Sequence, residues 1–271
     1  MELIVITDLD NTLLSKYKYD FTPALPAIEE LKRRGVPIIF CTSKTLGETV
    51  SFQEKIGIKD PFIVENGGGI YIPRVFYENF KGEKLDSEFF EIDLGVPAQI
   101  LYDFLYSFSK KYEVPIKTFL DFQPEELAKE TGLPLELAIL AREREFDLPF
   151  ILLKGSLGEK KKLQRMARKE KYLIQEGGRF LHISGRHTKA DAIREMFDFM
   201  GDKFNKAKKI GLGDSLNDLE MLSFVDIPIV VSGTGNPYLN KLKKALPHAK
   251  IYMNEGPIAW NQAIFDLLES I

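Results

Sequence analysis

The stretch ELIVITDLDNTLL, residues 2–14, decides the fold of this chain. Its apolar, β-branched run at residues 3–6 has the composition of a buried parallel strand. Asp8 and Asp10 follow where this strand ends, and in an open α/β sheet ligands bind beyond the carboxyl ends of the strands. In a chain that is still nearly extended, the two carboxylates point to the same side. Because neighbouring anions repel, the pair favours a bound hard cation such as Mg²⁺, which takes carboxylate, water and phosphate oxygens.

The alternative for this acidic pair is a solvated turn, because Asp and Asn are common turn residues. A DxDxT string alone does not separate the two hypotheses. Its position directly after a fully apolar first strand favours a binding site, which residues later in the chain have to complete.

Length, charge and cysteine content exclude several classes of protein. The 271 residues are enough for one or two domains, and a net charge of −3 argues against nucleic acid as the main partner. Cys41 is the only cysteine, which favours a reducing compartment, and no apolar stretch of about 18 residues is present to span a membrane. Met1 leads straight into a strand instead of a signal peptide, so we expect a cytoplasmic protein. We expect it to be a monomer or a small homo-oligomer.

A second strand end carries hydroxyl groups. Thr22 as N-cap and Pro23 predict the start of a helix, and a buried strand is expected at residues 36–41. Thr42 and Ser43 follow this strand where the next helix begins, a position at which hydroxyl and backbone donors suit a phosphate. The alternative is an ordinary N-cap.

A third strand end carries a glycine-rich loop. A short strand at residues 61–64 leads into Glu65, Asn66 and three consecutive glycines, residues 67–69. Such glycines indicate unusual dihedrals or a close approach of the backbone to another group. The loop either receives a substrate or forms a tight hairpin into the apolar residues 70–72.

Residues 81–186 are predicted to form a separate α+β unit inserted between the first strands and the last ones. Two arginines, Arg142 and Arg144, lie where one of its helices ends, and an arginine fork there would grip an anionic group; the alternative is a solvated face of alternating charge. Arg179 and His182 lie near a Gly177–Gly178 turn, and His182 could equally be a half-buried structural residue. The expected elements are strands at 89–94, 116–122, 150–154 and 180–183, and helices at 98–111, 124–130, 134–145 and 158–171.

The α/β pattern resumes after this unit. Lys189 opens a helix, which places a cation near a helix N-terminus, where an anion is favoured. A strand at residues 209–212 leads to Asp214, and Asp218 lies one helical turn further on and therefore on the same face. These two carboxylates form a second acidic half-site. Two more strands, at residues 227–231 and 251–253, and a helix at 257–268 complete the pattern.

The sequence therefore predicts an α/β protein. Its core is a Rossmann-like doubly wound parallel sheet formed by residues 1–80 and 187–271, with the α+β unit at residues 81–186 inserted.

Four short motifs, in order along the chain, resemble those of the haloacid dehalogenase superfamily of phosphotransferases. They are DLDNT at residues 8–12, Thr42-Ser43, Lys189, and GDSLND at residues 213–218. The long insert between the second and third motifs is similar to the cap of the Cof-type branch. More narrowly, the segments CTSKT (41–45), PFIVENGG (61–68), AREREFDLPF (141–150), GGRFLHI (177–183) and GPIAWN (256–261) resemble mannosyl-3-phosphoglycerate phosphatases. Ala190 and Leu148 depart from that pattern, since the family more often has Gly and an acidic residue at these places.

The resemblance implies a phosphatase that uses Mg²⁺ and an aspartyl-phosphate intermediate. Asp8 would attack the phosphoryl group, and Asp10 would protonate the leaving hydroxyl and then activate water. Mg²⁺ would be held by Asp8, the backbone carbonyl of Asp10, and Asp214, with support from Asp218 or Asn217.

The same resemblance implies the groups that hold the substrate. Thr42 and Lys189 would hold the phosphoryl oxygens, with Ser43 as a helper. The cap would close over the site, exclude water and read the leaving group. The other residues predicted to bind substrate are Glu65, Asn66, Gly67, Arg142, Arg144, Arg179 and His182.

The implied substrate is a small phosphorylated sugar or glycerate, in the first place mannosyl-3-phosphoglycerate, in the synthesis of the compatible solute mannosylglycerate. Alternatives are glucosyl-3-phosphoglycerate, sucrose phosphate or sugar phosphates in general. Two further alternatives are a phosphomutase, which needs a sugar bisphosphate activator, and a phospho-acceptor domain without hydrolysis. Asp10 and the inserted unit count against the last, because a receiver needs neither a second acid nor a cover.

Overall fold

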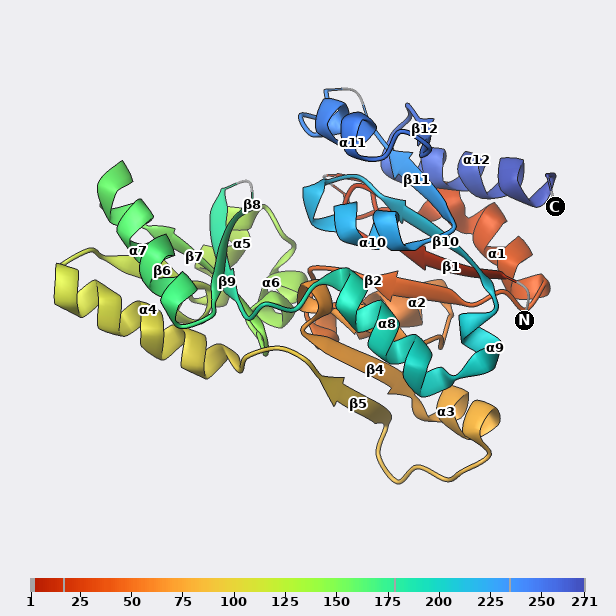
Figure 1. Cartoon of the computed structure of the whole chain (residues 1–271), viewed down its shortest axis with the longest axis horizontal. Helices are drawn as coiled ribbons and strands as arrows, with labels where there is room; N and C mark the ends of the chain where they lie inside the picture. Colours follow the sequence, from red (N-terminus) through yellow and green to blue (C-terminus); the bar gives the residue numbers. More distant parts are fainter. Residues whose placement is uncertain (1–2, 17, 178, 234, 271) are drawn as a thin grey trace.

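The first strand, β1 (Leu3–Thr7), lies inside an eight-stranded sheet in the computed structural model of the chain, which describes residues 3–16, 18–177, 179–233 and 235–270. The strand order is β12, β11, β10, β1, β2, β3, β4 and β5 (Figure 1). Strands from β12 to β3 pair in parallel, and β4 and β5 add an antiparallel edge. The predicted doubly wound α/β fold is confirmed. The other strands are β2 (Ile38–Cys41), β3 (Phe62–Val64), β4 (Gly69–Pro73), β5 (Phe89–Asp93), β10 (Lys208–Gly213), β11 (Ile227–Val231) and β12 (Lys250–Tyr252).

Helices cover both faces of this sheet, which explains why its central strands are apolar throughout. Along β1, Val5 packs into one hydrophobic cluster while Ile4 and Ile6 pack into the other, as the two-residue period of a strand requires. One face carries α1 (Leu25–Arg33), α2 (Leu46–Ile56) and α12 (Gly256–Leu268). The opposite face carries α3 (Arg74–Lys81), α8 (Lys189–Met200), α9 (Asp202–Asn205), α10 (Leu219–Phe224) and α11 (Leu239–Ala245).

Helix starts agree only in part with the sequence signals. The prediction of Thr22 as N-cap is wrong: Thr22 begins a short 3₁₀ helix, Thr22–Ala24, and α1 follows at Leu25. The Thr22 hydroxyl and backbone N–H both donate to the Asp20 carboxylate, and the hydroxyl oxygen of Thr22 accepts no capping hydrogen bond. By contrast, Thr45 caps α2 in a capping box with Glu48.

The elements from α4 to β9, residues 98–184, form a second α+β layer structure, hereafter the insert (Figure 1). Its antiparallel sheet has the order β6 (Ile116–Thr118), β7 (Asp147–Leu152), β9 (Phe180–Ser184) and β8 (Leu173–Gly177). The strand β8 was not predicted. Two helices, α4 (Ala98–Tyr112) and α7 (Leu157–Lys169), share a hydrophobic cluster on one face, and α5 (Pro124–Thr131) and α6 (Leu135–Ala141) share one on the other.

The large sheet extends beyond the predicted domain boundary near residue 80. β5 was assigned to the inserted unit, but it pairs with β4, so the large sheet extends to Asp93. Its side chains Phe90 and Ile92 join the cluster under α3 and α8 instead of the cluster of the insert. The division of the chain into domains stays a prediction, and we now place its first boundary after β5.

None of the described helices is long and apolar enough to cross a membrane.

Candidate active site

Two carboxylates and one lysine meet beyond the carboxyl ends of β1 and β10. Lys189 Nζ lies 2.7 Å from Asp8 Oδ1 and 2.7 Å from Asp218 Oδ1. All three side chains are buried: Asp8 is 3% exposed, Lys189 2% and Asp218 0%. Asp8 follows β1, Asp218 ends the 3₁₀ helix Leu216–Asp218 after β10, and Lys189 opens α8, so three distant segments build one cluster.

The loop after β10 is held by Asp218 itself. Its Oδ2 accepts hydrogen bonds from the backbone N–H groups of Asp214 at 3.0 Å and Ser215 at 3.1 Å. A Cβ atom at Gly213 would lie 2.6 Å from Asp218 Cβ, so only glycine allows this close approach. Asp218 thus gives one carboxylate oxygen to the loop and the other to Lys189.

Asp214 is the carboxylate with free oxygens. Among the described residues, no donor reaches its side chain, and one carboxylate oxygen each of Asp8, Asp214 and Asp218 lie within 4.8 Å of one another. Burial, and then the Asp218 and Asp8 charges, raise the pKa of Asp214 to about 9. Burial raises the pKa of Asp8 to about 7, although Lys189 opposes this shift. When all three carboxylates are ionised, they exceed the single ammonium group by two negative charges, which a hard divalent cation would neutralise.

Asp10 lies beside this cluster and has a different partner. Its Oδ1 is 2.9 Å from Lys44 Nζ, and its side chain is 35% exposed. Lys44 is itself buried and also meets Glu48, at 3.4 Å. Burial alone would lower the pKa of Lys44, but Asp10 and then Glu48 raise it above its ordinary value, so Lys44 stays a cation.

Sequence reasoning missed Lys44 as a site residue. The available signal was its place directly after the two strand-end hydroxyls, four residues before Glu48. Thr42 is buried, and its hydroxyl oxygen accepts the Lys44 backbone N–H at 3.2 Å. Ser43 is half-buried beside it. The pair thus lies in the same turn as a cation that faces Asp10.

The loop after β3 joins the site to the insert. The buried Glu65 carboxylate accepts the backbone N–H groups of Glu145, Phe146 and Asp147 at 2.9, 2.8 and 2.6 Å. Burial raises the pKa of Glu65 to about 7, against the lowering effect of Arg144 and of these donors. The Glu65 carboxylate is therefore fully used in holding the insert.

Asn66 and Gly67 complete that loop. Asn66 Nδ2 donates to Asp147 Oδ2 at 2.8 Å, and Asn66 Oδ1 accepts from Asn217 Nδ2 at 3.2 Å. Gly67 has φ +100°, and a Cβ there would lie 2.2 Å from the Thr188 carbonyl oxygen. The loop also connects the antiparallel strands β3 and β4, so the hairpin alternative is correct, and substrate binding by this loop stays a prediction. The Asn217 side-chain amide thus faces Asn66, and its support of a metal ion stays a prediction.

The four residues predicted in the insert divide into two groups. At the junction, His182 Nδ1 lies 3.0 Å from Asp147 Oδ1, and Arg144 Nη1 donates to the Ser43 carbonyl at 2.9 Å. Burial disfavours the Asp147 anion, but the charge and hydrogen bond of His182 outweigh it and lower the pKa of Asp147.

The other two, Arg142 and Arg179, are engaged within the insert. Arg142 Nη2 donates to the Leu120 carbonyl at 3.4 Å. Arg179, 62% exposed, donates to the Glu130 carbonyl at 2.6 Å and pairs with the Glu130 carboxylate. No contact of the described residues joins either arginine to the acidic cluster. Gly178, of the predicted turn, lies outside the described residues.

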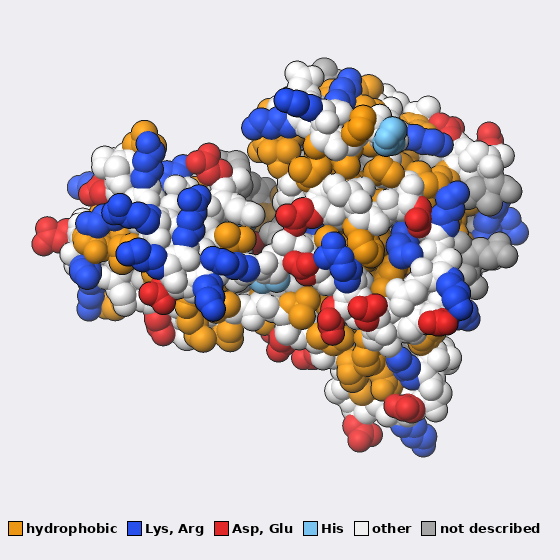
Figure 2. Space-filling model, in the orientation of Figure 1, with side chains coloured by type: hydrophobic (Ala, Val, Ile, Leu, Met, Phe, Trp, Pro, Cys, Tyr) orange, Lys and Arg blue, Asp and Glu red, His pale blue; other side chains and the backbone are white. Residues whose placement is uncertain are grey.

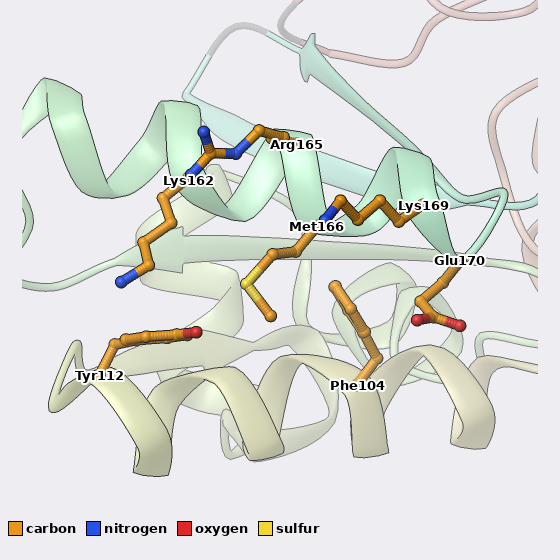
Figure 3. Close-up of a pocket in the computed structure, with 7 residues that line it drawn as sticks. All are labelled: Phe104, Tyr112, Lys162, Arg165, Met166, Lys169 and Glu170. Carbon is orange, nitrogen blue, oxygen red and sulfur yellow. The ribbon is translucent and has the colours of Figure 1, made fainter.

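A surface hollow of about 350 Å³ lies elsewhere, between α4 and α7 of the insert (Figure 3). In the same region Figure 2 shows many Lys and Arg side chains over the insert. None of the residues that line this hollow belongs to the acidic cluster. We therefore locate the candidate active site by its carboxylates and lysine and not by this hollow. The lining residues are Phe104, Tyr112, Lys162, Arg165, Met166, Lys169 and Glu170.

Fold and cluster together define a class of enzyme. Residues 5–92 match the family model of haloacid dehalogenase-like hydrolases. A haloacid dehalogenase-like hydrolase from Bacteroides thetaiotaomicron has the same fold, with a TM-score of 0.71 at 15% identity over 98% of this chain and 100% of that structure. The chain belongs to the haloacid dehalogenase-like hydrolases.

Within this family the chain is similar to a particular group of curated proteins. It is 35% identical, over 99% of its length and 98% of the relative's, to the glucosyl-3-phosphoglycerate/mannosyl-3-phosphoglycerate phosphatase of Persephonella marina. It is 32% identical to the mannosyl-3-phosphoglycerate phosphatase of Pyrococcus furiosus, over 84% of this chain and 90% of that protein.

Proposed function

We propose that this protein is a Mg²⁺-dependent phosphatase that hydrolyses mannosyl-3-phosphoglycerate, with glucosyl-3-phosphoglycerate as the closest alternative substrate. The observation that carries the chemistry is the buried cluster in which Asp8 and Asp218 share Lys189 while Asp214 keeps free oxygens. The names of the relatives that match nearly the whole chain support the choice of substrate.

In the first step Asp8 is the nucleophile. Its free Oδ2 forms a bond to phosphorus, the bond from phosphorus to the substrate oxygen breaks, and the Asp10 carboxyl group gives its proton to that oxygen. An aspartyl phosphate and a free alcohol result. Lys189 fixes the other oxygen of Asp8 at 2.7 Å, so the attacking oxygen is presented in one orientation.

In the second step Asp10 reverses its role. As a carboxylate it takes a proton from water, the water oxygen bonds to phosphorus, and the bond to Asp8 breaks, which releases phosphate and restores both side chains. Mg²⁺, held by Asp8, Asp214 and the Asp10 carbonyl with Asp218 in support, would neutralise the charge on the phosphoryl oxygens in both steps. Thr42, Ser43 and Lys189 would hold those oxygens.

The insert would read the rest of the substrate. At its junction with the large sheet, the groups with hydrogen-bonding capacity include Asn66, Asp147, His182 and Arg144. The His182 ring can donate a hydrogen bond and the Asp147 carboxylate can accept one, a combination that suits sugar hydroxyls. Arg142 and Arg179 remain proposals that require their present contacts to break.

The test is phosphate release from mannosyl-3-phosphoglycerate, glucosyl-3-phosphoglycerate, sucrose phosphate and plain hexose phosphates, each with Mg²⁺ and with EDTA. We expect a strong, Mg²⁺-dependent preference for the first. Broad and weak activity would support the phosphatase function but contradict the proposed substrate. Activity only with a sugar bisphosphate would indicate a phosphomutase, and a stable phosphorylated protein would indicate an acceptor domain.

We also keep the prediction of a cytoplasmic protein that is a monomer or a small homo-oligomer. Light scattering would measure the oligomeric state.

A further inference from the structure

We infer that Lys44 is the positioning residue of the proposed general acid, Asp10. This inference rests on the proposed phosphatase function. It gives a role to a buried cation that the reaction steps above do not use.

The Asp10 carboxylate depends on Lys44 for its orientation. Lys44 Nζ, at 2.9 Å, is the only partner that the described residues provide to this carboxylate, whose side chain is 35% exposed. A half-exposed carboxylate without a fixed partner would sample several rotamers. General acid catalysis needs the proton donor within hydrogen-bond reach of the leaving oxygen, so an anchor of this kind bears directly on rate.

Lys44 is itself held firmly. Glu48, 2% exposed, lies 3.4 Å from its ammonium group, and the rings of Tyr19 and Phe52 lie 5.0 and 5.6 Å from it. Such a cation, buried between two carboxylates and two aromatic rings, has little freedom to move.

The insert closes over the same turn. On one side of Lys44, Ser43 accepts a hydrogen bond from Arg144, and on the other, the Thr45 hydroxyl donates to the Leu140 carbonyl at 3.0 Å. Both neighbours of Lys44 in the chain are therefore tied to the insert, and these contacts fix the backbone that carries Lys44. This arrangement gives each proposed catalytic carboxylate its own lysine: Lys189 for Asp8 and Lys44 for Asp10.

The experiment compares two leaving groups. kcat/KM reports the steps up to the formation of the aspartyl phosphate, where an alkoxide leaving group needs a proton and p-nitrophenolate does not. In Lys44→Met we expect kcat/KM to fall about a hundredfold with the best alkyl phosphate and less than about tenfold with p-nitrophenyl phosphate. Lys44→Arg should recover part of the loss. In an Asp10→Asn background, Lys44→Met should add almost nothing, because its effect passes through Asp10.

Controls separate this role from folding. Lys55 lies 5.5 Å from the same Phe52 ring, so Lys55→Met removes an equivalent ring contact and should leave kcat/KM unchanged with both substrates. If Lys44→Met unfolds because Glu48 loses its nearer cationic partner, the double variant Lys44→Met/Glu48→Gln removes both charges and should show the same split between substrates.

An equal fall with both substrates, or a full additional loss in the Asp10→Asn background, would overturn the inference. A wild-type protein without Mg²⁺-dependent turnover of any phosphomonoester would overturn the proposed function, and the inference with it. The two failures are therefore distinguishable by the wild-type assay alone.

Discussion

At the scale of single residues, the Asp8–Lys189–Asp218 contacts make a sharp prediction about the nucleophile. Asp8→Asn keeps the size of the side chain and removes the attacking oxygen, so turnover should be lost, by at least about 10⁴-fold in kcat. The fold should persist, because Lys189 keeps Asp218 as its partner and the repulsion among the carboxylates decreases. Phosphate release and thermal unfolding measure the two effects. Retained activity would remove Asp8 from this role.

The raised pKa of Glu65 predicts how the stability of the fold depends on pH. The folded chain raises its pKa from 4.5 to about 7, so the native state keeps a proton that the unfolded state has already lost. The stability from this group is therefore full below about pH 4.5 and is lost as the pH rises toward 7. Glu65→Gln does not titrate and turns an N–H donor toward one backbone N–H group, at a cost of about 1–3 kcal/mol.

We therefore expect the stability deficit of Glu65→Gln to be largest in acid and to shrink between pH 4.5 and about 7. Urea unfolding of both proteins across this range measures the difference, in which the other titrating groups cancel. A deficit that grows with pH would contradict the assignment.

At the scale of elements, the loop after β3 has to pass close to the start of α8. A Cβ atom in Gly67→Ala would lie 2.2 Å from the Thr188 carbonyl oxygen, at a φ of +100° that only glycine adopts easily. Because Thr188 caps the helix that Lys189 opens, the clash should displace Lys189 and reduce activity as well as stability.

Gly35→Ala is the matched control for this change. Gly35 also has a positive φ, +64°, but nothing lies within 4 Å of its Cβ position. We expect Gly35→Ala to cost about 1 kcal/mol with unchanged kcat, and Gly67→Ala to cost about 3 kcal/mol or more with a loss of kcat. Denaturant unfolding and steady-state kinetics compare the pair. Equal losses in both variants would show that backbone strain alone is responsible.

At the scale of the whole molecule, a divalent cation would tie together the ends of β1 and β10. Since it binds the folded state, Mg²⁺ should raise the free energy of unfolding by about 2.7 kcal/mol at a hundred times its Kd. Asp214→Asn should remove most of this stabilisation, because Asp214 supplies the free oxygens of the cluster. Thermal unfolding with Mg²⁺ and with EDTA measures it. Asp86→Asn, in an exposed segment, is the control and should respond like the wild type.

The sequence by itself determined which residues end the central strands of the large sheet. Asp8 follows a strand of unbroken apolar residues and Asp214 follows another, and a parallel sheet gathers the carboxyl ends of its strands at one edge. Local composition therefore sufficed to predict the doubly wound fold and the two acidic half-sites, with Asp8 in one and Asp214 and Asp218 in the other. The family resemblance added Lys189 to them, and the catalytic roles of all four residues stay predictions.

Only the tertiary structure decided which polar groups form long-range structural contacts. Glu65 reaches backbone donors 80 to 82 residues away in the chain, Arg144 reaches Ser43, and β5 joins the large sheet instead of the insert. Nor did any local pattern show that Asp10 would meet Lys44. The physical reason is that a charged side chain takes its partner from whatever the packing of remote segments brings near, and burial then makes that choice costly to change.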